Sequence, residues 1–276
     1  MNAPSSSTPV PPSSAHTTRP FKTEPFVAVP WERADLDSIV SRPFGIYLHV
    51  PFCTSRCGYC DFNTYALRTF PPGPAGDPIA HWAEQLTKEL RLGAQILTDH
   101  NITPPAANTV FFGGGTPSLL GRQLPKILDV VRECFGIAPG AEITSEANPE
   151  STSPELFDCW RAGGVNRLSL GMQSSEPRVL ALLDRQHDPA RAVAAIEEAQ
   201  AAGFEHLNLD LIYGTPGETT DDVARSVDTV LATGVDHVSA YALTIEPGTA
   251  LFRKVAHGEI DPIDDCLLYT SPSPRD

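Results

Sequence analysis

Short apolar runs alternate along the chain with longer segments in which apolar residues recur at the spacing of a helix. The runs are rich in β-branched and aromatic residues and are bounded by Gly, Pro or Asn, which is typical of strands. They predict six strands, at residues 44–50, 109–114, 142–147, 167–172, 206–213 and 237–243. The intervening segments predict helices at residues 78–98, 124–131, 153–162, 188–202 and 223–231. Strands separated by helices indicate parallel pairing with right-handed crossovers, and therefore an α/β fold.

Glycine-rich and polar residues follow each predicted strand. In chain order, these segments are CTSRCGYC, GGGTPS, EANPE, GMQS, DLIYGTPGET and YALTIEPGT. Ligands of parallel α/β sheets bind at the carboxyl ends of the strands, whether the sheet stays open or closes into a barrel. The pattern therefore predicts that a site is built at this edge of the sheet.

Composition divides the chain into three parts. Residues 1–42 are rich in Pro, Ser and Thr and lack an apolar core segment, so they predict a disordered leader rather than a signal peptide. Residues 43–265 carry the strand and helix pattern. Residues 266–276 turn abruptly to a low-complexity Ser-Pro sequence, which is interpreted as a non-native or disordered tail where a C-terminal domain is missing.

Length and charge limit the classes of function. The 276 residues, 41% of them hydrophobic, suffice for one large domain with a substantial core. The net charge of −14 argues against nucleic acid or an anionic membrane surface as the main partner. No apolar stretch approaches the roughly 18 residues of a membrane span. Six cysteines are too sparse for a disulfide-stapled secreted domain, so a reducing compartment, the cytoplasm, is expected.

Half of these cysteines form one cluster. Cys53, Cys57 and Cys60 have the spacing C-x3-C-x2-C. A structural zinc site normally takes four ligands in paired short spacings, and no matching fourth Cys or His follows, although His49 lies close by. Iron–sulfur clusters are also held by Cys thiolates. Three thiolates would leave one iron of a [4Fe–4S] cluster open to a substrate or cofactor.

The cysteine spacing, with an aromatic residue before the last cysteine, resembles the signature of the radical S-adenosylmethionine (SAM) superfamily. GGGTPS similarly resembles the glycine-rich motif of that family. The resemblance implies a partial (β/α)6 barrel whose parallel strands are surrounded by outer helices. It also implies that SAM chelates the open iron through its amino and carboxylate groups. One electron from the cluster would then cleave SAM to a 5′-deoxyadenosyl radical.

Further motifs resemble one group within the superfamily, which contains oxygen-independent coproporphyrinogen III dehydrogenases and heme chaperones. They are YLHVPFC, EANP, SLGMQS, NLDLIYGTPGET and SAYALTIEPGT, and the resemblance covers about residues 43–262. Carried over position by position, it implies SAM contacts, some of them to a second SAM in the dehydrogenase, at Tyr47, Tyr59, Gly114, Gly115, Thr116, Glu146, Gln173, Arg185, Asp210 and Ala242. Each polar member also has a purely structural alternative, such as a helix cap or a surface ion pair. No catalytic residue is assigned.

One position separates the two branches of this group. The dehydrogenase resemblance would place another cysteine two residues after the third cluster ligand, and this sequence has Phe62 there. CGYCDFNTY is instead similar to the chaperone branch, whose members bind heme and pass it to acceptor proteins. A heme chaperone is therefore preferred. The alternatives are a coproporphyrinogen III dehydrogenase and, more remotely, a non-catalytic zinc-binding module.

The preferred interpretation implies a set of cofactors and partners. The cofactors are a [4Fe–4S] cluster and SAM, with heme as cargo. The partners are heme, heme-accepting proteins including membrane-bound ones, and an electron donor, with no nucleic acid among them. The resemblance places a His-Asn and Tyr-Trp heme motif in a further C-terminal domain. This sequence has no His-Asn pair, so no histidine is assigned to heme.

Overall fold

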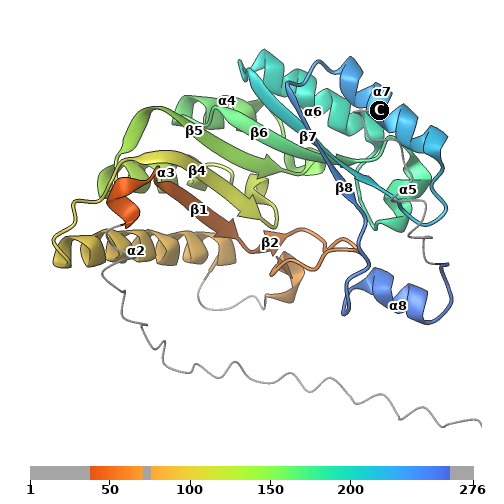
Figure 1. The fold of residues 1–276 in the computed structure, drawn as a ribbon, viewed down its shortest axis with the longest axis horizontal. Helices are drawn as coiled ribbons and strands as arrows, with labels where there is room; N and C mark the ends of the chain where they lie inside the picture. The colour runs from red at the N-terminus through yellow and green to blue at the C-terminus, as the bar shows by residue number, and fades with distance from the viewer. Residues whose placement is uncertain (1–37, 71–75, 262–276) are drawn as a thin grey trace, which may run out of the picture.

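The computed structural model describes residues 38–70 and 76–261. Its centre is a six-stranded sheet in the order β1-β4-β5-β6-β7-β8, in which every neighbouring pair is parallel (Figure 1). The strands are β1 Gly45–Val50, β4 Ala107–Gly114, β5 Ile137–Ala147, β6 Arg167–Gln173, β7 His206–Tyr213 and β8 His237–Ala242. The six predicted strands and their parallel pairing are thus confirmed.

The strands depart most from the prediction at β5 and at a short pair after β1. β5 begins at Ile137, five residues before the predicted start, because Ile137 pairs with Ala107 ahead of a register shift in β4. A separate parallel pair, β2 Phe52–Cys53 and β3 Tyr65–Ala66, was not predicted. Two-residue strands are too short to show a period, so only the fold reveals that this pair frames the cysteine loop.

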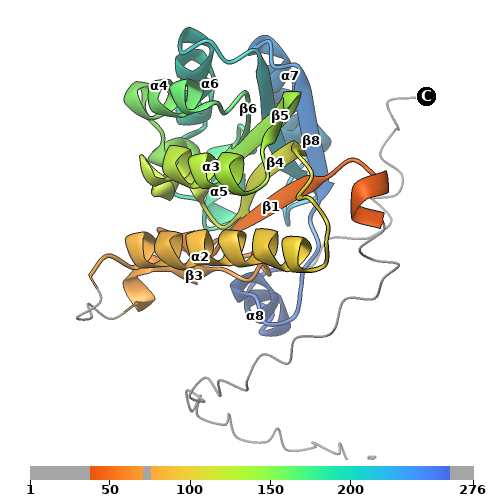
Figure 2. The same ribbon diagram turned by 90° about the vertical axis from the view of Figure 1, so that its left-hand side faces the viewer.

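Helices α3, α4 and α6 lie along one side of the sheet, whereas α8 lies apart from them, as Figure 2 shows. The bounds of the helices are α2 Pro78–Asp99, α3 Gln123–Cys134, α4 Pro154–Gly163, α5 Pro177–Leu182, α6 Pro189–Ala201, α7 Thr220–Ala232 and α8 Ala250–Ala256. Side chains of Asp77, Ser153 and Asp188 accept hydrogen bonds at the starts of α2, α4 and α6, and a proline follows each cap. The five predicted helices are confirmed; the short α5 and α8 were not predicted.

Side chains of successive strand residues point to opposite faces of the sheet, and one of these faces is apolar and the other polar. Leu168 and Leu170 of β6 are fully buried beneath the helices, where Phe157 and Trp160 of α4 complete the core. The residue between the two leucines, Ser169, points to the other face. That face carries the polar strand residues, and in the described chain the sheet has two free edges, at β1 and β8.

The predicted chain ends fall largely outside the described residues. Of the leader expected at residues 1–42, only 38–42 are described, and residues 38–41 are helical. The tail expected at residues 266–276 lies outside the described residues altogether. Both remain expectations from composition.

Candidate cluster and cofactor site

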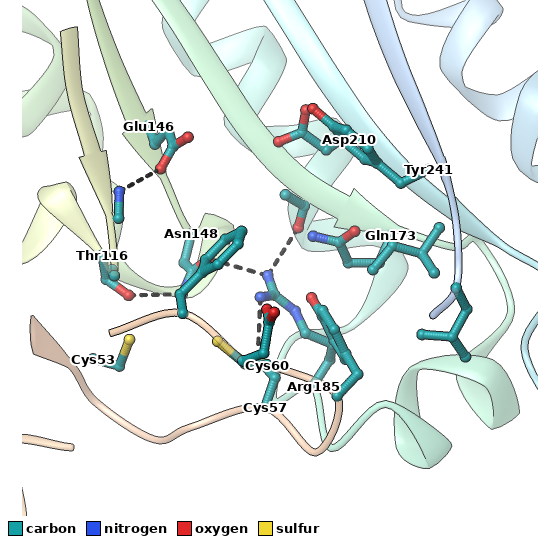
Figure 3. A pocket seen from close by; sticks show the side chains of 18 of the residues that line it. Cys53, Cys57, Cys60, Thr116, Glu146, Asn148, Gln173, Arg185, Asp210 and Tyr241 are labelled. Carbon is teal, nitrogen blue, oxygen red and sulfur yellow. Dashed lines mark hydrogen bonds between the residues drawn. The ribbon is translucent and has the colours of Figure 1, made fainter. Parts of the chain in front are cut away.

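A cavity of about 420 Å³ opens at the carboxyl ends of the strands (Figure 3). Its walls come from the cysteine loop after β1 and from the ends of β4, β5, β6, β7 and β8. This is the edge of the sheet at which the sequence predicts a site. Of the thirteen predicted site residues, the cavity brings together twelve, namely Cys53, Cys57, Tyr59, Cys60, Gly114, Gly115, Thr116, Glu146, Gln173, Arg185, Asp210 and Ala242.

The thirteenth residue, Tyr47, stands beside the cavity and is linked to it through His49. Its hydroxyl lies 3.0 Å from Nδ1 of His49, and Nε2 of His49 lies 2.9 Å from the carbonyl oxygen of Asn63. A carbonyl can only accept, so Nε2 carries the proton and Nδ1 accepts from Tyr47. Both ring nitrogens of His49 are therefore engaged. In the structure, His49 joins β1 to the cysteine loop.

The three clustered cysteines are free thiols on one wall of the cavity. Cys53 is buried, whereas Cys57 and Cys60 are half-buried. Figure 3 shows Cys53 standing apart from the other two. Within the described residues, no group of three His, Cys, Asp or Glu side chains converges as around a single metal ion. Burial, together with the neighbouring Cys60 and Cys57, raises the pKa of the Cys53 thiol, so metal binding there releases a proton.

The backbone of the cysteine loop is fixed at Gly58. Its N–H donates to the carbonyl of Leu183 at 3.1 Å, and its own carbonyl accepts from the N–H of Leu251 at 2.8 Å. These contacts tie the loop to the segment after α5 and to α8. Three thiols presented from an anchored loop into one cavity fit the donor set of an iron–sulfur cluster.

The glycine-rich motif packs directly against the strand that enters the cysteine loop. The N–H of Gly115 donates to the carbonyl of Val50 at 2.7 Å. A Cβ on Gly115 would lie 2.5 Å from the carbonyl oxygen of Phe52, and one on Gly114 would lie 2.6 Å from the His49 ring. Gly114 also has a φ of 113°, which disfavours other residues. The motif is therefore needed for close backbone approach.

Two half-buried carboxylates line the sheet side of the cavity. Oε2 of Glu146 accepts from the N–H of Gly114 at 3.0 Å. Asp210 accepts from Ser169 at 3.2 Å and from Asn208 at 2.7 Å. Burial raises the pKa of both carboxyls, and the charge of Asp210 adds to the rise at Glu146. Each carboxylate keeps acceptor capacity for the ammonium or hydroxyl groups of a ligand.

Arg185 connects the cysteine loop to the strand ends. It donates to Sγ of Cys57 at 3.5 Å, to the carbonyl of Gly171 at 2.9 Å and to Oδ1 of Asn148 at 3.2 Å. Burial lowers its pKa, but Cys57 and Tyr59 outweigh burial and raise it above the ordinary value. Its buried Nε has no hydrogen-bond partner within the described part of the protein. Arg185 can therefore donate to a ligand carboxylate.

Gln173 adds a second unpaired polar atom. It ends β6 with a φ of 68°, a left-handed conformation that is uncommon for a residue with a side chain. The register with β7 shifts between Gly171 and Gln173. Its buried Oε1 has no partner among the residues described. A buried acceptor without a donor is costly, which indicates that a bound group completes the site.

Some residues at the site were missed by sequence reasoning. Asn148 lies within the quoted EANP motif but was not assigned; it donates to Thr116 at 3.1 Å as well as accepting from Arg185. His187 is fully buried and contacts the carbonyl of Met172 through Nε2 at 3.0 Å, which holds the end of β6. Asn148 stands two residues after Glu146 in the EANP motif, and the two-residue period of a strand could have indicated that both face the site. His187 lies near a predicted strand end, but the sequence could not indicate its role, because its partner depends on the fold.

Comparison with known proteins decides the family. A family model described as the Radical SAM superfamily matches residues 47–230. This chain belongs to the radical SAM superfamily. The match begins within β1 and ends in α7, so it covers the cysteine loop and all but the last strand of the sheet. The fold class predicted from the sequence is thereby confirmed.

Curated relatives and one solved structure narrow the similarity within the radical SAM superfamily. The chain is 54% identical over 244 residues to the heme chaperone HemW of Mycobacterium tuberculosis, covering 88% of this chain and 60% of the relative. It is 36% identical over 228 residues to the heme chaperone HemW of Escherichia coli, covering 82% and 56%. The structure of coproporphyrinogen III oxidase (HemN) from Escherichia coli, a radical SAM enzyme, is similar with a TM-score of 0.68 at 29% identity, covering 89% of this chain and 52% of that protein.

Two limits follow from these matches. The chain spans about three fifths of the length of the HemW relatives. The radical SAM superfamily implies a [4Fe–4S] cluster and SAM, and the cavity residues fit both, while the individual ligand assignments stay predictions.

In the part of the chain that the structure describes, no helix is long and apolar enough to cross a membrane.

Proposed function

We propose that this chain is the radical SAM part of a heme chaperone, which binds heme and passes it to acceptor proteins. The observation that carries the proposal is the 54% identity over 244 residues to the heme chaperone HemW of Mycobacterium tuberculosis. The matched region includes the cavity and its cysteines. Phe62, at the position where the dehydrogenase resemblance would place a cysteine, supports the same branch.

The cofactor assignment belongs to this proposal. Cys53, Cys57 and Cys60 would hold a [4Fe–4S] cluster, which when bound supplies an open iron for SAM and an electron for its reduction. The unpaired Nε of Arg185 would donate to the SAM carboxylate. The unpaired Oε1 of Gln173 would accept from a SAM donor group.

Further residues of the cavity would orient SAM, chiefly by accepting hydrogen bonds from it. Glu146 and Asp210 accept from its ammonium or ribose hydroxyls, and the close packing of Gly114 and Gly115 against β1 and the cysteine loop fixes the end of β4. Tyr59, Thr116 and Ala242 also line the cavity, while Tyr47 acts from β1 through His49. The proposed protein partners are heme acceptors, including membrane-bound ones, and an electron donor, and the proposed location is the cytoplasm.

Heme transfer is the experiment that tests the proposed function. The chain is loaded with hemin anaerobically, separated from free hemin and mixed with an apo-heme protein, and transfer is followed by the Soret absorbance. The proposal expects stoichiometric hemin binding and transfer faster than release to buffer. Hemin that is bound but never yielded to an acceptor would contradict the proposal.

The structural similarity to coproporphyrinogen III oxidase favours a second candidate, an oxygen-independent coproporphyrinogen III dehydrogenase. Incubation of the reconstituted chain with reductant, SAM and coproporphyrinogen separates the two candidates. The chaperone proposal expects no protoporphyrinogen. Its formation, absent in the Cys57→Ala variant, would establish the dehydrogenase instead.

A further inference from the structure

The end of β6 contains a strained turn. Gln173 has a φ of 68°, and the N–H of Ser174 donates to the carbonyl of Met172 at 2.9 Å. A hydrogen bond between residues two apart, across a residue with positive φ, is typical of the rare and strained form of the γ-turn. Residues other than glycine avoid this conformation. The surrounding contacts must therefore hold the turn, and strain of this kind gathers at functional sites.

Both flanks of the turn depend on other elements. The pairing of β6 with β7 shifts between Gly171 and Gln173, so Met172 is the extra residue of a bulge. After the turn, the N–H of Ser175 donates to Oγ of Ser226 in α7 at 2.9 Å. Because the bulge takes Met172 out of the ladder with β7, its carbonyl needs donors from elsewhere in the fold.

His187 supplies a donor to that carbonyl. Nε2 of His187 lies 3.0 Å from the carbonyl oxygen of Met172, and because a carbonyl only accepts, Nε2 carries the proton. The side chain of His187 is fully buried, and its Nδ1 has no hydrogen-bond partner in the described residues and lies 3.7 Å from Oε2 of Glu150. The Met172 carbonyl therefore accepts one hydrogen bond that closes the turn and one that ties it to the loop before α6.

The same loop carries Arg185, which binds the preceding carbonyl of β6. Arg185 donates to the carbonyl of Gly171 at 2.9 Å. A Cβ on Gly171 would lie 2.7 Å from Nε2 of Gln173 and 3.2 Å from Nη2 of Arg185, so both side chains gather over this glycine (Figure 3). Each keeps a buried polar atom without a partner in the described chain. The loop with Arg185 and His187 thus brings two unpaired groups together at the cavity.

We propose that His187 is a positioning residue of the SAM site, which holds the strained turn and so presents the Gln173 amide beside Arg185. The inference rests on the proposed function, because it takes SAM as the ligand of the cavity. His187 touches no ligand and acts through the carbonyl of Met172. Without the His187 donor, that carbonyl keeps only the N–H of Ser174, and the turn can relax toward an ordinary φ.

Titration of the reconstituted full chain with SAM, at equal cluster iron, tests the role of His187. His187→Leu removes the donor in a side chain of similar size and is expected to weaken SAM binding about fivefold. His187→Gln places an N–H near the position of Nε2 and is expected to restore binding to within about twofold of the unsubstituted chain. A His187→Leu chain that binds SAM as tightly as the unsubstituted chain would overturn the inference.

Trp160 provides the matched control for loss of a buried hydrogen bond. Its ring is fully buried and donates to the carbonyl of Gly121 at 2.9 Å, outside the cavity. Trp160→Phe is expected to lower the thermal unfolding midpoint and to leave SAM affinity unchanged. A fivefold loss of SAM affinity in this variant too would show that any buried defect weakens the site, and the positioning role of His187 would be refuted.

A double substitution separates positioning from a general structural role. If His187 acts through Gln173, His187→Leu combined with Gln173→Ala should weaken SAM binding no more than Gln173→Ala alone, because the amide to be positioned is already gone. Losses that multiply in the double variant would mean that the two residues act independently, against the proposal.

The strain itself can be measured in the cofactor-free chain. Gln173→Gly and Gln173→Ala both remove the amide, but only glycine adopts a positive φ without strain. The unfolding midpoint is therefore expected to be about 2–4 °C higher for Gln173→Gly than for Gln173→Ala. Equal midpoints would show that the turn is not strained and would contradict the proposal.

The outcomes keep the positioning role apart from the proposed function. If the unsubstituted reconstituted chain does not bind SAM, the cofactor assignment in the proposed function fails, and the role of His187 fails with it. If that chain binds SAM and His187→Leu binds it equally well, only the positioning role is overturned and the SAM site stands.

Discussion

Arg185 shows how single residues combine distant parts of the chain into one site. It lies 128 residues from Cys57, yet the two side chains are 3.5 Å apart, and the same guanidinium reaches Gly171. The sequence predicts that both belong to the site, Cys57 from the cysteine motif and Arg185 from the family resemblance carried over by position. It cannot predict their contact, because that distance depends on how β6 and the cysteine loop pack.

The three thiols are the first residue-scale test. Cys53→Ala, Cys57→Ala and Cys60→Ala are each expected to lose nearly all cluster iron after anaerobic reconstitution, because three ligands leave none to spare. Iron and sulfide analysis with the visible absorption spectrum measures the loss. Cys134→Ala and Cys159→Ala remove free cysteines outside the cavity and should retain iron. Normal iron in any of the first three variants would refute the ligand assignment.

Glu146 gives a second test, based on stability. Its pKa is raised by burial and by Asp210, so the folded protein disfavours the ionised form. The protonated Glu146 carboxyl contributes stability that is fully present below its ordinary pKa of 4.5. That contribution is lost as the pH rises through the higher pKa that Glu146 has in the folded protein. Glu146→Gln is therefore expected to stabilise the cofactor-free chain at pH 7 by on the order of 1 kcal/mol, roughly 2–4 °C in Tm.

Two comparisons complete the Glu146 test. The stability gain should shrink as pH falls toward 4, and the same variant should bind SAM more weakly. Glu155 is the matched control, because backbone and Ser153 hydrogen bonds lower its pKa and its ionised form is favoured. Glu155→Gln should destabilise the chain slightly at pH 7. Thermal unfolding that shows Glu146→Gln less stable than the parent chain at pH 7 would contradict the account.

At the scale of elements, the sequence predicts the long strands and helices well and the short connecting pieces poorly. The periods of β7 and α3 extend over enough residues to be read directly, and the caps of α2 and α4 mark their starts. β2 and β3 contain two residues each, and α5 contains six. Such short pieces are stabilised by their neighbours in space, so local patterns do not indicate them.

Packing between β4 and the strand that enters the cysteine loop gives an element-scale prediction. Gly115→Ala would place a Cβ 2.5 Å from the Phe52 carbonyl and 2.9 Å from the Val50 carbonyl, so a backbone must shift. We expect a loss of about 1–3 kcal/mol in unfolding free energy, together with reduced cluster retention. Chemical denaturation and iron analysis measure the two effects.

Gly93 provides the matched control for Gly115. It lies inside α2, where a Cβ would meet only the Phe135 ring at an ordinary 3.8 Å. Gly93→Ala is therefore expected to stabilise the chain by about 1 kcal/mol, because Ala is the better helix former. If both substitutions were neutral, the close backbone approach at Gly115 would not be a constraint on the fold.

At the scale of the whole molecule, the sheet presents one covered face and one open one. The helices bury the apolar face, while the polar face and the strand ends form a cavity beside the edge strand β8. The polar and glycine-rich segments after the strands predicted the site at the strand ends, but not which face of the sheet stays open. The uncovered rings of Phe62 and Tyr241 could not be predicted, since exposure depends on what packs around each side chain.

The most direct test of the central claim is the electron paramagnetic resonance spectrum of the anaerobically reconstituted, reduced chain, recorded without and with SAM. A cluster on Cys53, Cys57 and Cys60 with an open iron predicts a signal of a reduced [4Fe–4S] cluster that changes shape when SAM is added. A colourless chain that holds one zinc ion would contradict the cluster assignment. A cluster signal that SAM leaves unchanged would contradict the assignment of the cavity to SAM.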